Sequence, residues 1–255
     1  MDGNVQPISR EDYERLLAYL QKKNPAAILP IQIAYYAGLR IGEACGLAWQ
    51  DVNLEEQCLT IRRSIRYDGS KRKYIIGPTK RKKVRIVDFG DTLVEIFRNA
   101  RKEQLKNRMQ YGELYHTNYY NAVKEKNRVY YEYYCLDRTE EVPADYKEIS
   151  FVCLRPDGCL ELPTTLGTVC RKVAKTLEGF EGFHFHQRGK PFIFRFAEQG
   201  GMFIARFRLG VNAGNVGYPF RLHLMQEVDQ GFNLRQKRGH VLPDGPAPFP
   251  EGGAD

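Results

Sequence analysis

The chain has 255 residues, of which 42% are hydrophobic, so a sizeable core can form within one large domain or two small ones. Its formal net charge of +8 favours a polyanionic partner, above all nucleic acid, although an anionic membrane surface or plain solubility also fits the charge. No run of about 20 apolar residues is present, and Met1 to Arg10 lacks the apolar stretch of a signal peptide. These features exclude a transmembrane helix and a secretory signal, and they predict a cytoplasmic protein.

Three helices are predicted before residue 50. Ser9 has the character of an N-cap, with an acidic residue three positions later and apolar residues at helical spacing up to the Asn24-Pro25 stop. A second, apolar helix is expected over residues 26–37, because Gly38 can cap its C-terminus. A short helix is expected over residues 41–47.

The next segment predicts a small antiparallel sheet of three strands. Residues 58–65 alternate and are rich in β-branched side chains, and Asp68-Gly69 is typical of a turn. Residues 74–76 and 84–87 read as the other two strands. The connections of this sheet carry basic residues.

Later elements alternate between helix and extended chain. Apolar residues from Leu93 mark one face of a long helix. A strand is expected over 149–153, a turn over 155–158 and a helix over 166–177. The overall expectation is an α+β fold that is mainly α.

Residues 105–145 read as an insertion in which tyrosines alternate with lysine, arginine and asparagine. Such rings can stack on nucleic-acid bases, with the basic residues contacting phosphates. The alternative, which we favour, is an amphipathic insertion whose rings pack on the domain surface.

Six cysteines are spread along the chain without a C-x-x-C pair. In a chain of this length, which is not a short secreted one, that usage is typical of reduced, mostly buried, small apolar side chains. Disulfides and metal ligands are therefore not expected from Cys45, Cys58, Cys135, Cys153, Cys159 and Cys170.

The composition changes abruptly near residue 187. Of the 16 tyrosines only Tyr218 lies in 187–255, whereas 11 of the 23 glycines lie there. No helical or alternating period persists in this stretch, and the Pro- and Gly-rich end is typical of disorder. Ordered structure is expected to fade after about residue 187.

The first of three basic sites is Arg40, within the run A-G-L-R-I-G-E that ends at Glu43. A guanidinium at a helix-to-helix junction, just after a glycine cap, can fork onto two phosphate oxygens. The alternative is a structural ion pair between Arg40 and Glu43. The residues alone leave both interpretations open.

The second site is the run G-P-T-K-R-K-K-V-R-I-V, in which Thr79 precedes Lys80. A lysine at the tip of a β-hairpin can reach a leaving oxygen as a general acid. The alternative is a solvated basic turn that contacts phosphates without reading sequence. The phosphate-binding candidates of this run are Arg81, Lys82, Lys83 and Arg85.

The third site is the run F-H-F-H-Q-R at residues 183–188, which contains His186 and Arg188. A histidine and an arginine close together can clamp a phosphate and move a proton. The alternation also fits the end of a strand. No metal is expected here, because no cysteine or acid lies at ligand spacing.

Taken in order, the three sites resemble the catalytic domain of tyrosine recombinases, in particular the integrases of phages and conjugative transposons. The resemblance rests on G-L-R-I-G-E with the downstream Leu47, Trp49 and Asp51, on T-K followed by R-I-V, and on E-G-F-H-F-H. It covers roughly residues 8–187. It implies the DNA breaking-rejoining fold, a helical bundle with a small three-stranded antiparallel sheet, as a partial catalytic domain over 1–187.

The resemblance also implies roles for these residues. Arg40 would bind the scissile phosphate, Lys80 would protonate the leaving 5′ oxygen, and His186 would open the H-x-x-R element to which Arg188 is the nearest arginine. A tyrosine would form a covalent 3′-phosphotyrosine link, so rejoining needs no ATP, metal or other cofactor. The implied partner is double-stranded DNA carrying an attachment or core site, bound by a homo-oligomer and without a membrane.

The family pattern fails at the third block. The H-x-x-R spacing puts Gly189 where an arginine is expected, and Arg188 comes one residue early. Tyr218, between Gly217 and Pro219, reads as a turn and is not assigned as the nucleophile. A shift of the reading frame near residue 187 would explain this departure and the change in composition, and a genuinely divergent C-terminus is the rival explanation.

We therefore predict site-specific DNA recombination or integration by strand cleavage through a phosphotyrosine intermediate. The activity is expected to be impaired in this chain, with residues 188–255 an aberrant and poorly ordered tail. The alternatives are a non-enzymatic basic DNA-binding module and an inactive remnant.

Overall fold

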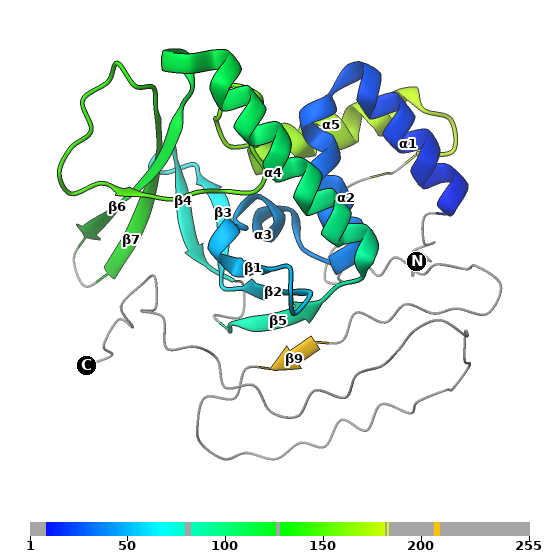
Figure 1. Cartoon of the computed structure of the whole chain (residues 1–255), viewed down its shortest axis with the longest axis horizontal. Helices are drawn as coiled ribbons and strands as arrows, with labels where there is room; N and C mark the ends of the chain where they lie inside the picture. The colour runs from blue at the N-terminus through cyan, green and yellow to red at the C-terminus, as the bar shows by residue number, and fades with distance from the viewer. Residues whose placement is uncertain (1–8, 80–82, 126–127, 182, 184–206, 210–255) are drawn as a thin grey trace.

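The computed structural model describes residues 9–79, 83–125, 128–181, 183 and 207–209 (Figure 1). Within these residues, α-helices and antiparallel sheets make up an α+β fold, as predicted. In Figure 1 the helices α1, α2 and α5 gather on one side, the long helix α4 crosses the front, and the strands lie on the other side and below.

The first helix, α1 (Arg10–Lys23), begins where the sequence predicts. The side-chain oxygen of Ser9 accepts a hydrogen bond from the backbone N–H of Asp12 at 3.0 Å, which satisfies one donor of the first turn. Tyr13, Leu16 and Leu20 face the core. The helix ends at Asn24, and the 3-10 turn η1 (Pro25–Ala27) leads into the next helix.

The second helix, α2 (Ile28–Ala37), ends at Gly38, which has φ 64° and is the predicted left-handed cap. The third, α3 (Ile41–Cys45), is two residues shorter than the predicted 41–47. Residues 49–51 form a 3-10 turn, η2 (Trp49–Asp51), after which the chain enters the first sheet. Arg40 is therefore held between two helices.

The predicted strand over 58–65 is two strands, β2 (Cys58–Ile61) and β3 (Arg63–Asp68). Every second residue from Leu59 to Ile65 is buried, so the alternation runs on through the break at Arg62. Only the pairing changes, because β2 pairs with residues 85–88 and β3 with residues 73–78. A period of two cannot reveal such a change of partner.

The three predicted strands therefore lie in two antiparallel sheets, and the expectation of one three-stranded sheet is wrong. The first sheet has the order β1-β2-β5-β9, with β1 (Val52–Asn53), β5 (Arg85–Asp88) and β9 (Phe207–Leu209). The second has the order β3-β4-β7-β6-β8, with β4 (Lys73–Pro78), β6 (Thr117–Glu125), β7 (Arg128–Leu136) and β8 (Lys147–Glu148). Apart from β9, the tail expected over 188–255 lies outside the described residues.

The segment 105–145 extends the second sheet. Helix α4 (Asp91–Tyr111) runs into it, and after the 3-10 turn η3 (Gly112–Leu114) strands β6 and β7 form a hairpin. The rings of Tyr120, Tyr131 and Tyr133 pack against the core, and Tyr133 meets Phe151 edge-on with 6.2 Å between ring centroids. These contacts support the interpretation of an insertion whose rings pack on the domain.

Residues 149–153 are not the strand that the sequence predicts. Phe151, Val152 and Cys153 are buried, but Phe151 makes only an isolated bridge, with Ala48. The segment lies beside the short turns after α3, which offer no long extended partner, so its apolar run reflects burial in the core. The turn over 155–158 and helix α5 (Pro163–Thr176) follow as predicted.

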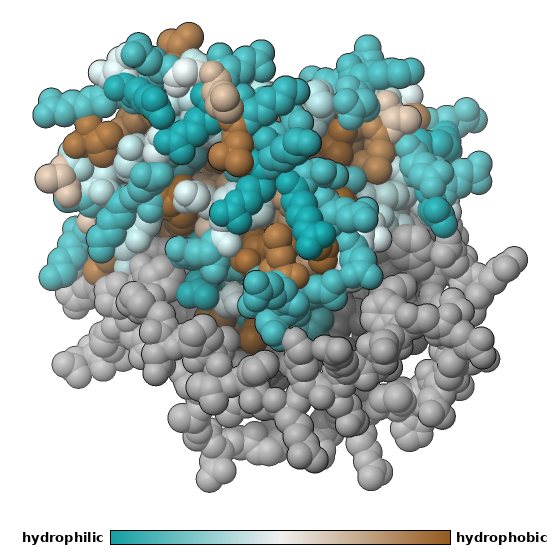
Figure 2. Space-filling view, viewed as in Figure 1, coloured by the Kyte–Doolittle hydropathy of each residue, from teal (hydrophilic) through white to brown (hydrophobic). Residues whose placement is uncertain are grey.

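Two groups of buried side chains form the core, and α3 lies between them. Cys45 packs with residues of α1, α5 and β3, whereas Ala44 and Leu47 pack with residues of α2, α4, β2 and β5. On the face in Figure 2, hydrophilic side chains cover most of the described surface and apolar side chains form separate small patches. Among the described helices, none is long and apolar enough to cross a membrane.

Candidate functional site

Arg40 is the N-cap residue of α3, with extended backbone (φ −72°, ψ 154°). Its backbone N–H donates to Oε2 of Glu43, three residues later, at 3.0 Å. This contact satisfies one of the free donors at the start of the helix and holds the two residues in a fixed relation. The spacing R-x-x-E in the sequence is thus the local reason for the geometry.

The Glu43 carboxylate joins two guanidinium groups. Nη1 of Arg40 donates to Oε1 at 3.0 Å, and Arg85 on β5 forks onto the carboxylate with Nη1 at 3.0 Å from Oε1 and Nη2 at 2.5 Å from Oε2. The Glu43 side chain is 1% exposed. A bidentate arginine on a buried carboxylate is among the strongest polar contacts that proteins make.

Glu43 is ionised in this arrangement. Burial by itself raises the pKa of the Glu43 carboxyl, but the hydrogen bonds from Arg85 and Arg40 outweigh it and hold the pKa below its ordinary value. One negative and two positive charges leave a net positive charge on the group. The Arg40 side chain is 31% exposed, so part of this positive charge faces solvent.

Both interpretations of Arg40 are therefore compatible with the geometry. The structural pair with Glu43 exists, yet among the described hydrogen bonds only Nη1 of the Arg40 guanidinium is used. Its Nε and Nη2 keep donors that can meet the oxygens of a phosphate. The ion pair thus positions the guanidinium while leaving part of it available.

The second basic site is only partly described. Arg85 is 16% exposed, and its guanidinium is engaged with the Glu43 carboxylate. Thr79 is buried, and its hydroxyl donates to the carbonyl oxygen of Lys83 at 2.9 Å, which closes the loop between β4 and β5. Lys83 is exposed. Lys80, Arg81, Lys82, His186 and Arg188 lie outside the described residues.

The loop after Thr79 is not the tip of a β-hairpin, because β4 and β5 belong to different sheets. The hairpin is made by β3 and β4, and its turn is at Asp68-Gly69, as predicted. The carboxylate of Asp68 accepts hydrogen bonds within this turn, from the backbone and the hydroxyl of Ser70. The segment after Thr79 is not a hairpin tip because β4 pairs with β3 and β7, whereas β5 pairs with β2.

A second charged cluster, which sequence reasoning did not find, surrounds Asp51. Nη1 of Arg63 donates to Oδ2 of Asp51 at 2.6 Å, and Nε of Arg62 lies 2.8 Å from Oδ1. The side chains of Arg63 and Asp51 are each 1% exposed. Burial raises the pKa of Asp51 and lowers that of Arg63, and their mutual attraction opposes both shifts. The period of two places Arg63 on the same face as Leu59, Ile61 and Ile65, and this was the signal that it would be buried.

Comparison with known proteins connects this site with a family. Residues 6–127, which include Arg40, Glu43 and Arg85, match the model of the phage integrase family. Over this range the chain is similar to the phage integrase family. The resemblance to tyrosine recombinases seen in the sequence is thereby confirmed for the segment that carries the first two basic sites. Among the relatives is the defective protein IntQ of Escherichia coli (strain K12), which is 32% identical over 62 residues.

The chain is also similar to solved recombinase structures. The Tn1549 transposon integrase in complex with transposon right end DNA is 17% identical with a TM-score of 0.46, covering 75% of this chain and 50% of that one. The XerA recombinase is 15% identical with a TM-score of 0.38, covering 74% and 47%. The chain spans about half the length of these structures and 15% of IntQ, where the match covers 24% of this chain.

Proposed function

We propose that this chain carries the phosphate-binding part of an integrase that cuts and rejoins double-stranded DNA at specific sites. The match of residues 6–127 to the model of the phage integrase family supports this, and so does the net charge of +8. In this proposal the protein acts in the cytoplasm, as a homo-oligomer assembled on an attachment or core site.

The arrangement of Glu43 between Arg40 and Arg85 is the observation that carries the proposal. Arg85 and the α3 backbone hold the Glu43 carboxylate, and that carboxylate holds one edge of the Arg40 guanidinium. The remaining edge is oriented before any ligand arrives. A preorganised guanidinium of this kind stabilises the negative charge that builds on a phosphate during strand cleavage.

The remaining roles follow the family pattern. Lys80 would protonate the leaving 5′ oxygen, His186 would assist at the phosphate, and Arg188 would stand one residue before the expected arginine position. The chemistry of the family passes through a 3′-phosphotyrosine link. Cleavage would be impaired in this chain, because neither the nucleophilic tyrosine nor the H-x-x-R arginine is in place.

Salt-dependent DNA binding tests the proposed contact of Arg40 with a phosphate. A duplex enriched from a random-sequence pool by the purified chain would be titrated at several salt concentrations with wild type and with Arg40→Ala. We expect log K to fall linearly with log salt, and Arg40→Ala to reduce the slope by about 0.9, the value for one phosphate contact. Arg138→Ala, which removes an exposed arginine on the loop after β7, is the matched control and should leave the slope unchanged. Equal slopes for wild type and Arg40→Ala would refute the role of Arg40.

Covalent trapping tests the proposed strand cleavage through a phosphotyrosine link. The gene would be sequenced through codons 180–255, a version with the alternative reading frame restored would be made, and both proteins would be mixed with a nicked form of the enriched duplex. We expect a covalent protein–DNA adduct from the restored version only, and its loss in that background with Arg40→Ala. If no frame restores an adduct, the chain is a binding module and the strand-cleavage proposal fails.

A further inference from the structure

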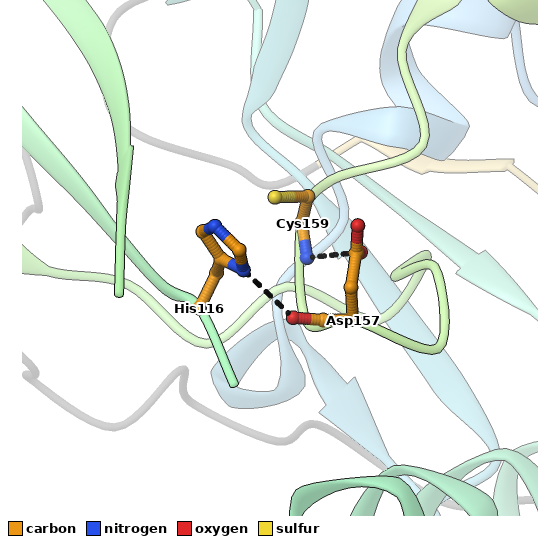
Figure 3. A group of neighbouring side chains, drawn as sticks. All are labelled: His116, Asp157 and Cys159. Carbon is orange, nitrogen blue, oxygen red and sulfur yellow. Dashed lines mark hydrogen bonds between the residues drawn. The ribbon is translucent and has the colours of Figure 1, made fainter. Parts of the chain in front are cut away.

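A cluster of metal-ligating side chains lies away from Arg40, where the insertion meets the turn before α5. His116, Asp157 and Cys159 each place one possible ligand atom within 4.8 Å of the others (Figure 3). Cys135, near the end of β7, brings its Sγ to 2.7 Å from Sγ of Cys159. Four groups from three separate parts of the chain therefore converge at one place. No sequence motif indicated this cluster, because His116, Cys135 and the Asp157–Cys159 pair lie far apart in the chain and share no motif spacing.

The proton position on His116 leaves one ring nitrogen free to bind a metal. Nδ1 lies 3.1 Å from the carbonyl oxygen of Asp157, which also accepts the backbone N–H of His116 at 2.9 Å (Figure 3). A carbonyl oxygen can only accept, so Nδ1 must carry the proton, and Nε2 of the neutral ring keeps its lone pair. Histidines that bind metals commonly donate their other ring N–H to a carbonyl or carboxylate in this way.

The backbone around the cluster is firmly held. Gly158 has φ 87°, and a Cβ there would lie 2.4 Å from the carbonyl oxygen of His116, so only glycine fits between the turn and the start of β6. The amide of Asn118 donates to the Gly158 carbonyl at 2.9 Å, and the Tyr133 hydroxyl donates to the Asn118 side chain at 2.7 Å. The ligand groups are thus carried by segments that are hydrogen-bonded to one another, as a preorganised site requires.

We propose that His116, Cys135, Cys159 and Asp157 bind a single zinc ion that joins β6, β7 and the turn before α5. Two sulfurs, one imidazole nitrogen and one carboxylate oxygen are a donor set that zinc takes in a tetrahedral arrangement. With Zn–S bonds of about 2.3 Å the two sulfurs would stand roughly 3.8 Å apart, so binding separates them by about 1 Å from their present contact. The thiols lose their protons to solvent as the metal binds.

Asp157 already has two contacts, and they fix which oxygen can bind. One carboxylate oxygen accepts the backbone N–H of Cys159 at 3.0 Å, and the other lies 2.9 Å from Nη2 of Arg155. Arg155 is exposed, so exchanging its guanidinium for the metal costs little. The contact with Cys159 can persist. This proposal is independent of the proposed DNA function, because the cluster shares no residue with the Arg40 site.

Metal analysis of the full chain provides the test. The protein would be purified under reducing conditions, loaded with Zn²⁺, dialysed and analysed for bound metal by atomic emission. We expect about one zinc per chain for wild type and a large loss for Cys135→Ser, Cys159→Ser and His116→Gln. Cys58→Ser, which alters a half-buried cysteine outside the cluster, is the matched control and should retain the metal.

Two further measurements use wild-type protein and so do not depend on whether a variant folds. Wild-type protein stripped with a chelator should gain thiolate-to-metal charge-transfer absorption when Co²⁺ is added, and its melting temperature should rise when Zn²⁺ is added. Absence of stoichiometric metal and of cobalt absorption in the wild type would overturn the proposal. A Cys135–Cys159 disulfide that survives purification under reducing conditions, found by peptide mapping of protein with no metal bound, would also overturn it.

Discussion

Gly42 packs directly against Ser64, so α3 lies in close contact with β3. A Cβ on Gly42 would stand 2.5 Å from Oγ of Ser64 and 2.6 Å from the carbonyl oxygen of Ile65. Gly42, the second glycine of the G-L-R-I-G-E run, has an ordinary helical backbone conformation. Glycine is therefore required here by the close approach of β3, and not by an unusual φ angle. Because α3 carries Glu43 and begins at Arg40, this contact also sets where the Arg40 guanidinium lies.

Gly42→Ala should destabilise the protein. The added methyl meets a backbone carbonyl, which cannot move aside as a flexible side chain can, and we expect a loss of about 1–3 kcal/mol. Gly167→Ala is the control: it lies in α5 with no atom within 4 Å of the added Cβ, and it should be neutral or stabilising by up to about 1 kcal/mol. Urea unfolding followed by circular dichroism measures both, and equal effects of the two changes would contradict the packing argument.

Glu43→Gln should be strongly destabilising although the side chain keeps its shape. The change leaves Arg40 and Arg85 without their shared negative charge. Removing one partner of a fully buried pair costs about 3–5 kcal/mol, and we expect about 2–3 kcal/mol here because the two arginines are 31% and 16% exposed. The control is Glu95→Gln on the exposed face of α4. A loss no greater than that of the control would show that the pairing contributes little.

The same carboxylate predicts a pH dependence. The pKa of Glu43 is lower in the folded protein than in the unfolded chain, so its contribution is fully present above the unfolded value of about 4.3 and is lost as pH falls through the folded pKa. The difference in unfolding free energy between wild type and Glu43→Gln should therefore shrink with acidification below about pH 4.3. Unfolding curves from pH 6 downward measure it. A difference that stays constant or grows on acidification would be inconsistent with the lowered pKa.

Asp51→Asn should cost more stability than Arg63→Met. Without the Asp51 charge, Arg63 is buried with no counter-charge, and its Nε and Nη2 have no hydrogen-bond partner among the described atoms. Without Arg63, the Asp51 carboxylate still has Arg62 at 2.8 Å, and the methionine fills most of the space. The double variant should be less destabilised than Asp51→Asn alone. Chemical denaturation of the three variants decides this, and the reverse order would disprove the argument.

Local chain chemistry was enough to predict much of the fold. The Ser9 cap, the Gly38 cap and the Asp68-Gly69 turn are all where the sequence indicates, because each depends on interactions within a few residues. The division of 58–65 into two strands was not predictable in this way. Burial alternates without interruption through Arg62, and only the identity of the pairing partners separates β2 from β3.

For the candidate site, the sequence by itself pointed to Arg40 and offered its pairing with Glu43 as one of two interpretations, since R-x-x-E at the start of a helix can bring the two side chains together. Only the tertiary structure decided that Arg85, 42 residues after Glu43, completes the pair. It also decided that Arg63 is buried against Asp51 and that His116, Cys135 and Cys159 converge. Such contacts depend on which strands and turns become neighbours, and neighbours distant in sequence leave no mark in residue spacing.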